Sequence, residues 1–180
     1  MRPSRVLPLF TVLVLSACNS GETVTAKNES AESVARKVAA STIKPLPGQW
    51  ASTMKIEKME LPNMPPEAKA MMEKQLASAQ TFTSCLKPEQ VEKPDAEFFQ
   101  GKSSFCTYDT FTMGGGKIDA VMTCGKGSQS RKMTMTGTYG PEAYAMRMSS
   151  AGEMQPGMPM SMTMSISAKR IGECTGKEDI

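Results

Sequence analysis

From Gly48 onward, apolar and polar residues alternate along much of the chain, a pattern typical of strands that bury one face of a sheet. In the first such stretch Trp50, Met54 and Ile56 fall on one side, and the other side is mostly polar. Six further stretches have the same character: 81–86, 105–113, 117–124, 132–139, 144–150 and 159–168. We therefore expect about seven strands, each with a register fixed by its apolar side.

One helix and one tight turn interrupt this pattern. Pro66 suits the first turn of a helix, and Met72 and Leu76 follow at helical spacing, which predicts a short helix between the first two strands. Three glycines at 114–116 predict a hairpin turn, because glycine readily adopts the positive φ angles that such turns need. The chain is therefore predicted to be mainly β, an antiparallel meander of about seven strands forming an open barrel or a sandwich.

The N-terminal end has the character of an export signal. Arg2 and Arg5 precede an apolar run over 6–15, which is shorter than the roughly 20 residues that a membrane-spanning helix needs. The Leu-Ser-Ala-Cys sequence that ends at Cys18 resembles the lipobox of bacterial lipoproteins. This resemblance implies a signal peptide over 1–17 and a lipid anchor on Cys18. With Asn19 beside it, it also implies an outer-membrane lipoprotein that faces the periplasm.

The segment that follows is predicted to be a flexible tether over 18–47, ahead of a β domain over 48–180. It is rich in small and polar residues and ends in a proline-containing stretch, which is typical of linkers. Within it Ala31, Val34 and Val38 fall at helical spacing and indicate a short amphipathic helix. Because an alanine-rich face buries little area, the favoured interpretation is a solvated helix, and the alternative is a helix that docks on a partner or on the membrane surface.

Charge and composition argue against several function classes. Without the signal, 21 − 2 = 19 basic residues face 18 acidic ones, and no basic patch is interleaved with aromatics, so nucleic acid is not an expected partner. The sequence contains no histidine, the usual base for a Ser or Cys nucleophile, so neither an enzyme nor a cofactor is expected. Asp109 and Asp119 could form a carboxylate pair, but they share the phase of polar residues and are assigned to a solvated face.

Four cysteines remain besides Cys18, and in an exported protein an even set predicts disulfides. The favoured pairing joins Cys85 to Cys106 and Cys124 to Cys174, because Cys85 ends one strand and Cys106 opens the next. The alternative joins Cys106 to Cys124 across the glycine turn and leaves Cys85 for Cys174. The sequence alone does not choose among the three possible connectivities. Without a Cys-x-x-Cys motif or a histidine, a zinc site is not expected.

Methionines are the most unusual component, since 16 of the 17 follow the signal and several occupy alternate positions. The favoured interpretation is that they fill a β core, because methionine is flexible and adapts to irregular space. The alternative is a soft-metal site for Cu(I) or Ag(I), because thioethers are soft ligands and alternate residues share one strand face. Scavenging of oxidants is a third interpretation. The candidate metal ligands are Met133, Met135, Met158, Met160, Met162 and Met164.

Four landmarks resemble an exported proteobacterial family catalogued as domain of unknown function thirty-six seventeen. They are Gly48-Gln49-Trp50, the Met- and Pro-rich stretch 59–66, the segment 85–89 and the segment 169–174. The resemblance covers 48–174 and implies a small exported domain with a four-cysteine framework, without implying an activity. We therefore expect a lipid-anchored envelope protein, a structural or binding module whose partner is an envelope protein, a lipid or a glycan.

Overall fold

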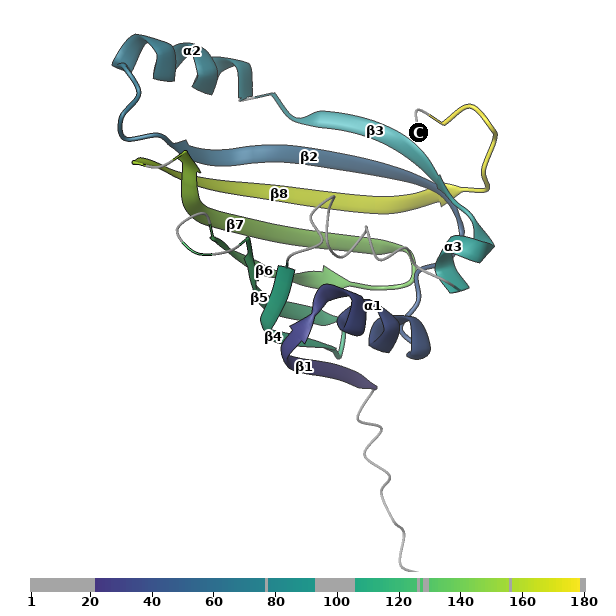
Figure 1. The fold of residues 1–180 in the computed structure, drawn as a ribbon. Helices are drawn as coiled ribbons and strands as arrows, with labels where there is room; N and C mark the ends of the chain where they lie inside the picture. The colour runs from purple at the N-terminus through teal and green to yellow at the C-terminus, as the bar shows by residue number, and fades with distance from the viewer. Residues whose placement is uncertain are drawn as a thin grey trace, which may run out of the picture.

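The fold is a single open sheet. The computed structural model describes residues 22–178 except 77, 93–105, 126, 128–129 and 156. In this part of the chain eight antiparallel strands follow the order β1-β4-β5-β6-β7-β8-β2-β3 (Figure 1). The strands are β1 (Thr23–Ser30), β2 (Gly48–Glu60), β3 (Gln80–Leu86), β4 (Cys106–Gly114), β5 (Lys117–Cys124), β6 (Arg131–Tyr139), β7 (Ala143–Gln155) and β8 (Met158–Gly172). The predicted mainly antiparallel β fold is confirmed, as one open sheet and not a sandwich.

The described residues also form three helices, α1 (Ala31–Ala40), α2 (Pro66–Leu76) and α3 (Pro88–Glu92). The predicted helix between the first two strands of the sequence analysis is α2, and it begins at Pro66. The predicted glycine turn joins β4 to β5, where Gly115 and Gly116 have φ angles of 56° and 74°. In Figure 1, α1 and α3 lie near one end of the strands and α2 lies at the other.

The prediction of a flexible tether over 18–47 is wrong for the described residues 23–40, which form β1 and α1. Val34 is 0% exposed, and Ala31, Ala35 and Val38 are also buried. Ser30 caps the helix by accepting a hydrogen bond from the backbone N–H of Ser33 at 3.2 Å. Small side chains allow α1 to approach the sheet closely, so the alanine-rich face belongs to the core.

The two faces of the sheet differ as the alternation predicts. The inner face, against which α1 packs, carries the core of Tyr108 and Phe111, whose rings meet edge to face at 5.3 Å. Cross-strand register continues this face over β6, β7 and β8 through Met135, Met148 and Met164. The outer face is polar: Thr136 lies opposite Asp119 on β5 and Arg147 on β7, and Arg147 forms an ion pair with Glu57 at 2.9 Å.

Two disulfides join the described cysteines, Cys85 to Cys174 and Cys106 to Cys124. The favoured pairing from the sequence is therefore wrong, and the alternative is the one observed. The reason is the strand order. Cys106 and Cys124 are direct partners across the β4–β5 hairpin. β2 joins the sheet beside β8 and pairs with β3 on its other side, so β3 forms the edge opposite β1. β3 stands six places from β4 in the strand order, and Cys85 bonds instead to Cys174 in the chain that leaves β8.

Candidate functional site

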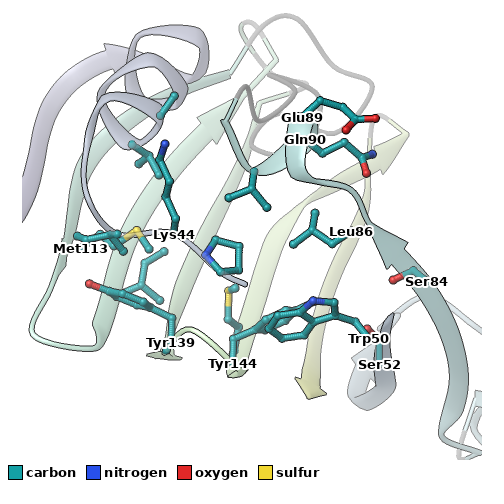
Figure 2. A pocket seen from close by; sticks show the side chains of 18 residues that line it. Lys44, Trp50, Ser52, Ser84, Leu86, Glu89, Gln90, Met113, Tyr139 and Tyr144 are labelled. Carbon is teal, nitrogen blue, oxygen red and sulfur yellow. The ribbon is translucent and has the colours of Figure 1, made fainter. Parts of the chain in front are cut away.

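A cavity of about 650 Å³ lies at one end of the inner face, beneath α1 and α3 (Figure 2). This volume falls within the range of pockets that bind small molecules, about 300–1,000 Å³. The wall residues come from four separate parts of the chain and most are apolar. They are Val38, Ala39, Ile43, Lys44, Pro45, Trp50, Ser52, Ser84, Leu86, Glu89, Gln90, Val91, Met113, Ile118, Tyr139, Gly140, Tyr144 and Met146.

Aromatic side chains from β2, β6 and β7 form the side of the cavity that lies lowest in Figure 2. The rings of Trp50 and Tyr144 stack with centroids 6.0 Å apart and planes 29° apart. The indole N–H of Trp50 donates to the carbonyl oxygen of Leu46 at 3.1 Å. Burial raises the pKa of Tyr144, whereas its hydrogen bond with Ser52 acts in the opposite direction. Both rings are thereby held in fixed positions, and the phenol of Tyr144 stays neutral at physiological pH.

The opposite wall is the end of α1 together with the segment 42–47. The hydroxyl of Ser41 donates to the carbonyl oxygen of Val38 at 2.7 Å and closes the helix. The backbone N–H of Thr42 donates to the carboxylate of Glu22 at 2.7 Å. At the far end of the segment, the backbone N–H of Leu46 donates to the carbonyl oxygen of Pro141 at 2.8 Å. The wall is therefore attached both to the start of β1 and to the β6–β7 turn.

The charged groups of the cavity lie on the side away from the aromatic rings. Figure 2 shows Glu89 and Gln90 on α3 and the side chain of Lys44 rising toward the same side. The ammonium group of Lys44 forms an ion pair with Glu92 at 2.8 Å. The cavity therefore combines an apolar interior with a mixed-charge rim, an arrangement that suits a molecule with an apolar body and a polar end.

The six methionines predicted as metal ligands lie outside this cavity. Met133 and Met135 pack against the core, and Met160, Met162 and Met164 are half-buried on the same inner face. Met158 is 41% exposed at the start of β8. The sheet brings methionines together across strands: Met148 on β7 lies opposite Met135 on β6 and opposite Met164 on β8. We call Met135, Met148 and Met164 the methionine row.

Other candidates from the sequence are placed apart or fall outside the described residues. Asp109 accepts a hydrogen bond from the hydroxyl of Thr123 at 3.0 Å, whereas Asp119 lies opposite Thr112, so register does not pair the two carboxylates. The part of the chain that the structure describes holds no group of three or more His, Cys, Asp or Glu side chains suited to a metal ion. None of its helices is long and apolar enough to cross a membrane. Cys18 and the predicted signal lie outside the described residues.

Comparison with protein families gives one result for this chain. A family model described as "Protein of unknown function (DUF3617)" matches residues 45–174. The chain belongs to this family. Searches of the curated proteins and of the solved structures found no significant match. The DUF3617 match begins at Pro45, a residue of the cavity wall, and ends at Cys174. β1 and α1 therefore precede the matched region. The cavity is built from residues before the match and residues within it.

Sequence reasoning missed the cavity of this DUF3617 protein because its walls meet only through the strand order. Two local signals were nevertheless present. Ile43 and Pro45 are apolar residues in a stretch otherwise typical of a linker, and they indicate contact with the domain. Trp50 is the only tryptophan of the chain and is a large side chain at the very start of a strand, where an open end of the sheet needs to be covered.

Proposed function

We propose that the protein is a binding module of the cell envelope, lipid-anchored at Cys18, whose cavity takes up a small apolar or amphipathic molecule. The cavity of about 650 Å³ is the observation that carries this proposal. The lipobox-like sequence before Cys18 supports the anchor. The two disulfides fit an oxidising compartment such as the periplasm. Outer-membrane location belongs to the same proposal and rests on Asn19.

The lining favours an apolar ligand over a sugar or a peptide. Trp50, Tyr144, Leu86 and Ile118 provide apolar surface from four different strands. Removal of each methylene group from water contributes about 0.8 kcal/mol, so even a short hydrocarbon chain would bind measurably in a preformed cavity. A sugar would need several hydrogen-bonding groups, and the charged and amide side chains of the lining, Lys44, Glu89 and Gln90, stand on the side away from the aromatic rings.

The test uses a soluble form that begins at Asn19 and the apolar fluorophore N-phenyl-1-naphthylamine. Ala39 lines the cavity, so Ala39→Phe should fill it, whereas Ala40 on the same helix is exposed and does not line it. We expect wild type and Ala40→Phe to bind the fluorophore alike. Ala39→Phe should bind it about ten-fold more weakly or worse, since a ring would occupy ligand space. Equal binding by all three, at matched melting temperatures, would contradict the proposal.

A second candidate function, soft-metal binding, is favoured by the methionine row. Its three thioethers stand on one face at directly opposed positions of neighbouring strands, which suits Cu(I) or Ag(I). Cu(I) under reducing conditions should then raise the melting temperature of wild type, because a ligand of the folded state stabilises it. Met148→Leu should abolish this rise while nearly preserving stability. Met71→Leu is the control, since Met71 is 75% exposed on α2. No rise in wild type excludes this function.

A further inference from the structure

The described chain begins beside the cavity. Thr23, the first residue of β1, lies opposite Gly114 at the β4–β5 turn. Glu22 accepts hydrogen bonds from the backbone N–H and the hydroxyl of Thr42, and the next two residues, Ile43 and Lys44, line the cavity. Figure 1 shows the start of β1, the β6–β7 turn and α3 at the same end of the sheet. Glu22 and the start of β1 therefore lie at the cavity end of the sheet.

This placement restricts how an anchored molecule can stand on a membrane. Cys18 precedes Glu22 by four positions, and four extended residues span at most about 14 Å. The sheet is much longer, because the 15 residues of β8 extend over about 50 Å. A lipid on Cys18 would therefore hold the cavity end near the bilayer and keep α2, at the other end, well away from it.

The walls of the cavity suit a flexible hydrocarbon chain. Met113 and Met146 contribute unbranched side chains that adapt to the shape of a ligand. The rim holds the carboxylate of Glu89 and the ion pair of Lys44 with Glu92, so it offers no single sign of charge to select an anionic or a cationic head group. Recognition would therefore rest on the apolar chain, with the polar end left at the rim.

We infer that the ligand of the cavity is an acyl chain of a phospholipid, taken from the bilayer in which the protein is anchored. This inference rests on the proposed function, which supplies the anchor at Cys18 and the ligand-binding cavity. It adds the source of the ligand and the direction of entry. The short spacing between Cys18 and Glu22 delivers the cavity to the membrane surface, and lipid exchange takes place there.

The experiment uses full-length acylated protein in vesicles of phosphatidylethanolamine and phosphatidylglycerol that contain a phosphatidylethanolamine with a diazirine at the end of one acyl chain. After illumination, adducts are mapped by mass spectrometry. We expect adducts on wall residues such as Tyr144 and Met146 in wild type and in Ala40→Phe, and their loss in Ala39→Phe. The unanchored form that begins at Asn19 should give about ten-fold fewer adducts or less, because the anchor raises the local lipid concentration.

The possible results distinguish failure of this inference from failure of the proposed function. Anchor-dependent adducts inside the cavity support both. Fluorophore binding by the soluble form without lipid adducts in the anchored form overturns the inference and leaves the binding function standing. Adducts of equal yield with and without the anchor overturn the direction of entry. Cavity adducts formed by the protein's own acyl chains, seen when those chains carry the diazirine instead, overturn the bilayer as the source of the ligand.

Discussion

Two tyrosines, the buried Tyr108 and the half-buried Tyr144, connect single side chains to the pH dependence of stability. Tyr108 is 1% exposed in the core and Tyr144 lies in the cavity wall. Burial raises the pKa of Tyr108 above its ordinary value of 10.0, because desolvation disfavours the phenolate. Burial raises the pKa of Tyr144 as well, against the effect of its bond with Ser52. Both side chains therefore stay protonated in the folded state at a pH where they ionise in the unfolded state.

The sign of the effect follows from this difference. A group whose pKa is raised by folding contributes fully to stability when the pH is below its pKa in the unfolded state. This contribution is lost as the pH rises through its pKa in the folded state. We expect the free energy of unfolding to fall as the pH rises above about 10. Tyr144→Phe should be less stable at neutral pH, since Ser52 loses a partner, yet its stability should fall less steeply above pH 10. Urea unfolding across this pH range measures both effects. Identical slopes would show that Tyr144 has no part in the pH dependence.

At the scale of elements, α1 differs most from its prediction, because it was expected to be solvated and it packs in the core. Val34 is fully buried, so Val34→Ala should lower the free energy of unfolding by about 2 kcal/mol through lost burial and a residual cavity. Arg36 is the matched control: its side chain is 66% exposed and pairs with Glu32, so Arg36→Ala should cost less than about 0.5 kcal/mol. Chemical denaturation measures the free energy of unfolding of both variants. Equal, small effects would mean that α1 is a solvated helix after all.

The elements that the sequence predicted are those with a strong local period. β8 alternates Met or Ile with Ser or Thr, and α2 begins with a proline, so each could be recognised from its own residues. Strand β1 was not recognised, because its segment resembles a linker. Helix α1 was indicated by its spacing, but its burial was missed because its apolar side is mostly alanine and valine. The strand order also could not be predicted, since local patterns carry no information on the pairing of β2 with β8. For that reason the cavity and the disulfide pairing were missed together.

For the molecule as a whole, the two disulfides close loops of very different length. Cys85 and Cys174 are separated by 89 positions, and Cys106 and Cys124 by 18. Loop-closure entropy then gives about 4.6 kcal/mol for the first bridge and about 3.2 kcal/mol for the second. We expect the double alanine variant of the Cys85–Cys174 pair to be the less stable of the two. Thermal unfolding of both variants tests this, and the reverse ranking would show that local packing around Cys106 outweighs chain entropy.

The long-range disulfide also has a consequence for the cavity. β3 is an edge strand that pairs only with β2 within the described sheet, and it leads directly into α3. Together they supply Ser84, Leu86, Glu89, Gln90 and Val91 to the cavity wall. Cys174 fastens this edge to the chain that follows β8. Loss of the bridge should therefore loosen one wall of the cavity while the rest of the sheet stays paired.

Ligand binding should respond to this loosening more than to loss of the other bridge. The alanine variant of Cys85–Cys174 should bind N-phenyl-1-naphthylamine several-fold more weakly, about 1 kcal/mol, because the wall must be ordered on binding. The matched variant of Cys106–Cys124 should bind it as wild type does, since neither cysteine lines the cavity. The measurement is a fluorescence titration at a temperature where both variants are folded. Equal affinity in the two variants would show that β3 and α3 keep their place without the bridge, and that the cavity is held by the sheet alone.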